Sequence, residues 1–312
     1  MARFRYFSCF RSSKGETEGP SEIIHEKKSV KADQPKYLHC VANARESREL
    51  VVAIDTSDPG CVLGEGRLGR EVAVKWFDEQ ADLSEEVQML CSVEHSNLIN
   101  MIGYCDKGKE FRVIVFEFMP LRSLNLHLRD LQPGQKPLDW KTRMKIAEGV
   151  AKALEYLHDQ KDPPVIYSGL KTSHFGCAKR GLKWDYAPIH KKYVRGYGYI
   201  PTEYFMTRVL TLKSDVYGFG VVLLELISGE KAIQANMRGS GKHSILSWTR
   251  PLLNDSNKFS EIVDPLMKGQ YPYAGLDKAL NLAKMCVKMD AHERPPIAEV
   301  LITLSKIVSQ IN

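Results

Sequence analysis

The stretch LGEGRLGREVAVK, residues 63–75, is the most informative local pattern in this chain of 312 residues. Its glycines, Gly64, Gly66 and Gly69, have G-x-G-x-x-G spacing, and the apolar run that follows ends at Lys75. Such glycines let a backbone approach phosphate oxygens, and a nearby lysine supplies positive charge. The spacing alone is a weak signal, because a plain tight turn also favours glycine.

The connection between the glycines and the lysine is short. Only five residues separate Gly69 from Lys75. An outgoing strand, a turn and a returning strand need about a dozen positions. We therefore expect one strand to be missing, and we expect that the glycine segment does not fold over phosphates as a hairpin lid.

The composition limits the classes of protein to which the chain can belong. With 43% hydrophobic residues, it can form one large domain or two lobes. The longest apolar stretch, residues 217–227, contains Glu225 and is too short to cross a bilayer. The seven cysteines include no Cys-x-x-Cys pair, which indicates a reducing compartment such as the cytosol. The net charge of +6 is mild and scattered, so we expect no nucleic-acid binding.

Local patterns divide the chain into three parts. Residues 1–48 are polar and charge-rich, which predicts a flexible N-terminal extension. Residues 49–119 contain two short apolar runs that predict strands, at 72–75 and 113–116, with a helical pattern between them. This pattern predicts a small α+β lobe.

Residues 120–312 have mainly helical patterns. An N-cap at Asp139 and a C-cap at Gly229 mark two helix ends. The helix before Gly229 is apolar all round, so it should lie at the centre of this part. The predicted helices run over 140–158, 214–227, 277–289 and 296–308.

Further short motifs follow the glycine stretch in a fixed order. They are Glu86 in a predicted helix, the hinge FEFMP at 116–120, SDVY at 214–217 and ERP at 293–295. This ordered set resembles the plant receptor-like cytoplasmic kinases, serine/threonine kinases that relay signals from cell-surface receptors. The resemblance covers about residues 48–308. It implies an α+β, bilobal protein-kinase-like fold, with a shortened β-rich N-lobe at 49–119 and a larger helical C-lobe at 120–312.

The resemblance also implies roles in nucleotide binding. Lys75, beside the glycines of 63–69, would hold the ATP phosphates and pair with Glu86. Glu117 and backbone groups near Met119 would bind adenine. A plain ion pair is the alternative for Lys75 and Glu86, and exposed pairs contribute less than about 1 kcal/mol.

Four other residues would have structural roles by the same resemblance. Glu203 would pair with Arg294, and Asp215 would brace the backbone of the catalytic loop. Phe175 would belong to an apolar spine between the lobes, although ordinary core packing is the simpler interpretation.

The run VIYSGLKTSHFG, residues 165–176, departs from the family pattern. Gly169 stands where an aspartate would orient the substrate hydroxyl, and His174 stands where the pattern requires oxygen ligands for Mg²⁺. Magnesium discriminates against imidazole. We therefore expect no intact catalytic residue, poor Mg²⁺ binding and weak ATP binding.

These losses predict a pseudokinase that acts as a scaffold, decoy or allosteric partner in receptor or immune signalling. The alternative is an active serine/threonine kinase that transfers the ATP γ-phosphate to proteins, with Asp185 or Glu65 supplying metal coordination. A third explanation is that the missing blocks are errors of gene prediction. For all three, the resemblance implies receptor kinases, active cytoplasmic kinases or immune sensors as partners.

Two other segments bear on regulation and location. Residues 176–201 contain no serine or threonine, so the phosphorylation switch of the related kinases is absent. Ala2 replaces the glycine that myristoylation requires. Cys9, between two phenylalanines and near basic residues, is either a palmitoylation site or an ordinary free cysteine. We expect a cytoplasmic protein, with peripheral attachment to the inner face of the plasma membrane through the N-terminus as a further option.

Overall fold

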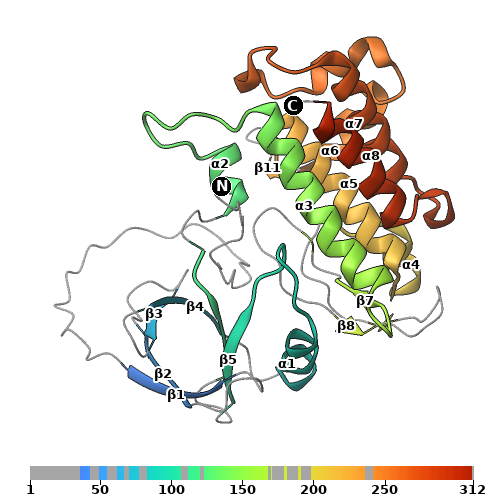
Figure 1. Ribbon diagram of the computed structural model, residues 1–312. Coiled ribbons are helices and arrows are strands. Elements are labelled where there is room, and N and C mark those ends of the chain that lie inside the picture. The colour runs from blue at the N-terminus through green and yellow to red at the C-terminus, as the bar shows by residue number, and fades with distance from the viewer. Residues whose placement is uncertain are drawn as a thin grey trace, which may run out of the picture. The chain divides into compact units, whose positions relative to one another are not determined.

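Figure 1 shows the computed structural model of the chain, which describes residues 36–42, 49–54, 62–66, 70–76, 83–106, 112–119, 123–167, 170, 179–180, 189–190, 198–235 and 242–310. The described residues fall into two compact units. A β unit contains those between 36 and 83 together with 100–118. A helical unit contains 84–99 and those from 119 onwards.

The β unit is a closed barrel of antiparallel strands. Its strands are β1 (Lys36–Ala42), β2 (Glu49–Ile54), β3 (Val62–Gly66), β4 (Arg70–Trp76), β5 (Met101–Asp106) and β6 (Arg112–Glu117). They pair in the order β1-β2-β3-β4-β6-β5, and β1 closes the barrel by pairing with β5, where Val41 lies opposite Tyr104. Closure leaves these strands without an unpaired sheet edge.

Strand β1 corrects one expectation from the sequence. Residues 1–48 were expected to form a flexible extension, but residues 36–42 pair with β2 from Lys36 opposite Ile54 to Val41 opposite Glu49. The segment KYLHCVA contains several residues that favour strands, and pairing on two sides compensates for the loss of chain entropy. The rest of the predicted extension, 1–35 and 43–48, lies outside the described residues.

The predicted strands and helix of residues 49–119 are confirmed. Residues 72–74 of β4 and 113–116 of β6 are buried, as their apolar runs predict. Helix α1 (Leu83–Ser92) forms over the predicted segment. Its residues Met89 and Leu90, however, pack into the core of the helical unit, so α1 groups with that unit rather than with the strands.

The four helices predicted in this unit are present, although the third spans 273–286 rather than the predicted 277–289. Its α-helices after α1 are α2 (Leu124–Leu128), α3 (Trp140–Asp159), α4 (Thr202–Thr207), α5 (Leu212–Ser228), α6 (Ile245–Leu252), α7 (Tyr273–Cys286) and α8 (Ile297–Ser309). Its 3₁₀ turns are η1 (Ser256–Ile262), η2 (Pro265–Met267) and η3 (Ala291–Glu293). Short strands pair two by two as β7 (Val165–Ile166) with β8 (Lys179–Arg180), β9 (Ile189–His190) with β10 (Val209–Leu210), and β11 (Ile233–Ala235) with β12 (Lys242–Ser244).

Helix α5 is the centre of this unit, as its apolar sequence predicts. Every residue from 214 to 228 is buried, and α3, α6 and α7 pack against the helix. Figure 1 shows α3, α5, α7 and α8 side by side. A capping box of Thr211 and Ser214 begins α5. Gly229 ends it at φ +73°, where a Cβ would also lie 2.7 Å from Asp264 Oδ2.

The start of α3 confirms the other predicted cap. The backbone N–H of Thr142 donates to Asp139 Oδ1 at 2.7 Å. Hydrogen bonding by the side chain of Thr142, more than by this N–H, lowers the pKa of Asp139. Among the described helices, none is long and apolar enough to cross a membrane. The predicted α+β fold class is confirmed by a strand barrel and a helical unit within one chain.

Candidate functional site

Part of the predicted site lies outside the described residues. This holds for Gly69, Gly169, His174 and Phe175. For Lys75 and Glu86 the structure describes the backbone and not the side chain, so their predicted ion pair stays a prediction. The described part of the site consists of the strands that carry Gly64, Gly66 and Lys75, and of the residues that hold the ends of the segment 168–197.

The glycine segment and the lysine strand form a hairpin, which corrects the expectation that one strand is missing here. Whether this hairpin covers phosphates as a lid stays a prediction. Gly64 lies opposite Val72, and Gly66 lies opposite Arg70. The hairpin fits because β3 begins at Val62 and only residues 67–69 connect the strands. The glycines thus serve as the outgoing strand, and β2, which pairs with β3, takes the neighbouring place in the barrel.

Lys75 lies on β4, a strand with a hydrogen-bonded neighbour on each side. Strand β4 pairs with β3 on one side and with β6 on the other, where Lys75 lies opposite Ile114. The preceding residues 72–74 are buried. The pairing of Gly64 with Val72 and of Gly66 with Arg70 sets the register of the lysine strand relative to these two glycines.

The predicted adenine-binding residues, Glu117 and Met119, lie at the end of β6 and directly after it. Glu117 ends the strand: its backbone N–H donates to the carbonyl of Asn100 at 3.1 Å, and its Oε1 accepts from the N–H of Asn100 at 3.2 Å. This two-way contact ties the end of β6 to the residue before β5. Met119, which is buried, groups with the helical unit, so the cut between the two units falls at Phe118, next to the predicted boundary at 119/120.

Asp215 is the central polar group of the helical unit at the start of α5. Its carboxylate is buried, and its Oδ2 accepts from the backbone N–H of Tyr167 at 2.6 Å. The same oxygen lies 3.0 Å from His158 Nε2. Since residue 167 is the last described before 168–169, this contact fixes the start of the predicted catalytic loop, as the resemblance implies for Asp215.

His158 was not singled out as a site residue from the sequence. It lies on the buried face of α3, in its last turn, and is itself buried. The only signal was a histidine at an apolar position of an amphipathic helix, which more often indicates core packing. Its contact with Asp215 joins the end of α3 to the start of α5.

The predicted pair of Glu203 and Arg294 is present and bidentate. Arg294 Nη1 and Nη2 donate to Glu203 Oε1 and Oε2 at 2.6 and 2.8 Å. The remaining N–H groups of the buried guanidinium donate to the carbonyls of Lys288, Lys213 and Met289, at 2.9, 3.0 and 3.2 Å. All five donors of the arginine are therefore used. The contact ties α4 to η3 and to the start of α5.

The segment before α4 has a second attachment. The hydroxyl of Tyr199 donates to Glu225 Oε2 at 2.7 Å, and the other oxygen of this buried carboxylate accepts from Arg129 Nη2, also at 2.7 Å. Gly198 adopts φ +102°, where an added Cβ would lie 2.7 Å from Ile233 Cγ1. These contacts attach the chain to α5 where it enters α4, as Asp215 attaches it at Tyr167.

The helical unit holds the chain on either side of the segment 168–197. Among the described residues, no group of three or more His, Cys, Asp or Glu side chains is placed to hold a metal ion. The buried carboxylates of Asp215 and Glu225 are engaged by donors of the chain itself.

Comparison with known proteins gives consistent matches. A family model described as "Protein kinase domain" matches residues 65–303. "Probable serine/threonine-protein kinase PBL7" of Arabidopsis thaliana is 43% identical over 327 residues, with 96% of this chain and 85% of the relative covered. Two further Arabidopsis proteins are similar: "Serine/threonine-protein kinase PBL27" at 45%, covering 87% of this chain and 58% of the relative, and "Serine/threonine-protein kinase PBS1" at 44%, covering 84% and 64%.

The length of the first alignment is informative. It runs over 327 positions, although this chain has only 312 residues. The relative therefore contains residues that have no counterpart here. Extra residues in the relative are expected if segments of this chain are shortened.

Proposed function

Because the chain belongs to the protein kinase family, we propose that it is a serine/threonine-type signalling kinase that acts on other proteins, with slow transfer of the ATP γ-phosphate. The observation that carries the proposal is the buried Asp215 carboxylate, which binds the backbone N–H of Tyr167 directly before the predicted catalytic loop. The bidentate pair of Glu203 and Arg294 holds the far end of the loop region. Relatives that resemble most of this chain are named as serine/threonine kinases.

Nucleotide binding is supported by the β unit. The backbone of Lys75 lies in β4, next to the strand that carries Gly64 and Gly66. A lysine beside a glycine-rich strand suits phosphate oxygens, because the glycines let the backbone approach and the ammonium group is cationic. We therefore assign the phosphates of ATP to this strand pair and the adenine to the region of Glu117 and Met119.

Slow transfer follows from the chemistry of the loop residues. Glycine at 169 and imidazole at 174 do not fit Mg²⁺, which requires hard oxygen ligands, so these two positions support no metal-assisted step. The glycine also removes the carboxylate that would accept the proton of the substrate hydroxyl. Loss of such general-base assistance lowers a rate by about 10² to 10⁴.

A second candidate is a pseudokinase that acts as a scaffold, decoy or allosteric partner without phosphoryl transfer. It is favoured by the same two positions, Gly169 and His174, and by the absence of serine and threonine from 176–201. In this case the anchors at Asp215 and Arg294 would preserve a binding surface rather than a reaction site.

A transfer assay with a restored variant separates the two candidates. Purified protein is incubated with radiolabelled ATP, Mg²⁺ or Mn²⁺ and a generic basic protein, beside Lys75→Met as the inactive control. A double variant, Gly169→Asp with His174→Asp, returns both carboxylates. Our proposal predicts faint labelling that depends on Lys75, and labelling about 10²-fold faster in the double variant.

Each outcome decides between the candidates. Labelling of the wild type that is equal to Lys75→Met, with strong labelling by the double variant, would establish the second candidate. No labelling by either protein would refute the transfer proposal. A thermal-shift titration with ATP, with and without Mg²⁺, tests weak, metal-independent nucleotide binding separately, and cDNA sequencing across codons 69–72 and 167–176 tests the gene-prediction explanation.

Location and partners extend the same proposal. We assign the protein to the cytoplasm, with peripheral attachment to the plasma membrane through a palmitoylated Cys9, and with receptor kinases, active cytoplasmic kinases or immune sensors as partners. The support is the family resemblance and the basic, aromatic surroundings of Cys9 in the sequence. Fractionation of the wild type and Cys9→Ser tests the attachment: equal membrane fractions would exclude it.

A further inference from the structure

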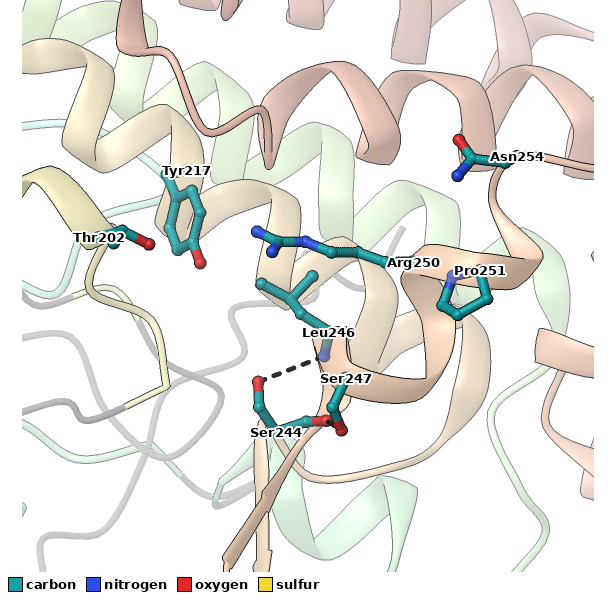
Figure 2. A pocket seen from close by; sticks show the side chains of 8 residues that line it. All are labelled: Thr202, Tyr217, Ser244, Leu246, Ser247, Arg250, Pro251 and Asn254. Carbon is teal, nitrogen blue, oxygen red and sulfur yellow. Dashed lines mark hydrogen bonds between the residues drawn. The ribbon is translucent and has the colours of Figure 1, made fainter.

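A pocket of about 620 Å³ opens on the helical unit (Figure 2). Thr202 at the start of α4 and Tyr217 on α5 line one side. The other side is formed by α6, with Ser244 as its N-cap, Arg250 in its last turn and Asn254 just beyond its end. This volume falls within the range of about 300–1,000 Å³ that is typical of ligand pockets.

Among the described residues that line the pocket, Arg250 is the one that carries a formal charge, and this charge is positive. Figure 2 shows the guanidinium of Arg250 directed toward Tyr217. Burial raises the pKa of Tyr217, whereas the charge of Arg250 lowers it, so the field of the arginine reaches the phenol. The neighbouring carboxylate of Glu203 is bound to Arg294, and no carboxylate in the described part of the chain forms an ion pair with Arg250.

Polar groups beside Arg250 can complete the binding of an anion. The Oγ of Ser244 accepts from the N–H of Leu246 at 3.3 Å, which is the dashed line in Figure 2. A hydroxyl that accepts one hydrogen bond can still donate its own proton. The amide of Asn254, which is exposed, is a further donor on the same wall.

The rim next to the arginine is apolar and adaptable. The Sδ of Met289 lies 3.1 Å from Arg250 Nη2 and 3.8 Å from Thr202 Oγ1, and 52% of this residue is exposed. A methionine is flexible and polarisable, so it can adapt to apolar side chains of different shapes. A ligand that fills this pocket thus meets one cation and an exposed thioether side by side.

We propose that this pocket binds an acidic segment of a partner protein, in which a carboxylate pairs with Arg250 and an adjacent apolar side chain covers Met289. A charge-assisted, bidentate contact suits the planar guanidinium. Phosphorylated segments are recognised by clusters of arginines, whereas this pocket has one, which favours a single carboxylate. The inference concerns recognition alone and holds for either candidate function.

Fluorescence polarisation of the full chain tests the proposal. The probe is a short labelled peptide of alternating glutamate and leucine residues, and the matched peptide has glutamine in place of every glutamate. We expect the chain to bind the glutamate peptide, with affinity that falls as salt is added, and to bind the glutamine peptide at least about tenfold more weakly. Arg250→Gln should lose about tenfold in affinity for the glutamate peptide, and Arg250→Lys should lose less.

Two further variants guard against indirect effects. Lys152→Gln also removes one positive charge, from an exposed pair with Glu148 on α3, and should bind the glutamate peptide as the wild type does. Ser247→Phe, at an exposed position that lines the pocket, should block binding while leaving the melting temperature close to that of the wild type. Equal affinity for the two peptides, equal losses in Arg250→Gln and Lys152→Gln, or no binding of the glutamate peptide at millimolar concentration would each overturn the proposal.

Discussion

The bidentate contact between Glu203 and Arg294 allows a sharp test of how α4 is held. Glu203→Ala leaves a buried guanidinium with three backbone carbonyls and no counter-charge. Removing one partner of a fully buried pair costs about 3–5 kcal/mol. The side chain of Glu203 is 27% exposed, so water reaches the vacated site, and we expect a loss of about 2–3 kcal/mol in the free energy of unfolding. Urea titration followed by circular dichroism measures this loss.

The control for this test lies one residue before the arginine. Glu293 forms an exposed pair with Lys288 at 3.3 Å, with 55% of the Glu293 side chain accessible, so Glu293→Ala should cost less than about 1 kcal/mol. Glu203→Gln, which keeps a hydrogen-bond acceptor but loses the charge, should fall between the two alanine variants. If Glu203→Ala and Glu293→Ala shift the urea midpoint equally, the buried pair does not anchor α4 and the reasoning fails.

Three other predictions concern α5 and its neighbours. An alanine Cβ at Gly220 would lie 2.7 Å from the Cβ of Cys286, so Gly220→Ala should lose about 1–3 kcal/mol of stability, whereas Gly218→Ala, whose nearest new contact is 3.4 Å, should lose less in the same urea titration. Burial raises the pKa of Cys286 to about 12 from an ordinary value of 9.0, so its stabilising contribution should be complete below pH 9 and decline as the pH rises toward 12. Thermal melts across this range should show a steeper decline for the wild type than for Cys286→Ala. Asp215→Ala leaves the N–H of Tyr167 without its acceptor and should cost about 1–3 kcal/mol, and Asp215→Asn should cost less; equal melting temperatures for the two variants would contradict this role.

The sequence predicted the helical unit well because its signals are local. The cap at Asp139, the apolar run of 214–227 and the glycine at 229 each determine a helix end or a buried face by short-range physics. The observed bounds of α3 and α5 agree with these signals within two residues. The pairing of Glu203 with Arg294 came from the family resemblance, since nothing local links positions so far apart in the chain.

The β unit was predicted less completely because strand pairing is not local. The expectation of a missing strand assumed that the whole hairpin lies between Gly69 and Lys75, whereas the outgoing strand β3 already contains Gly64 and Gly66 and a short connection suffices. Strand β1 was missed because its partners, β2 and β5, lie at different distances along the chain, and short polar-flanked runs such as 36–42 give a weak strand signal. The role of His158 was missed for the same reason, since Asp215 reaches it only in the folded unit.

The buried anchor residues of this kinase chain affect its stability, whereas the loop residues at 169 and 174 affect phosphoryl transfer. Asp215, Arg294 and Glu225 are buried and engaged by the chain's own donors or acceptors, so they contribute to stability whether or not phosphate is transferred. Gly169 and His174 are instead the two positions at which the sequence lacks the carboxylates of the family pattern. We therefore expect the double variant, Gly169→Asp with His174→Asp, to transfer phosphate much faster while its urea midpoint stays close to that of the wild type. A large loss of stability in the double variant would show that the loop residues and the anchors are not separable.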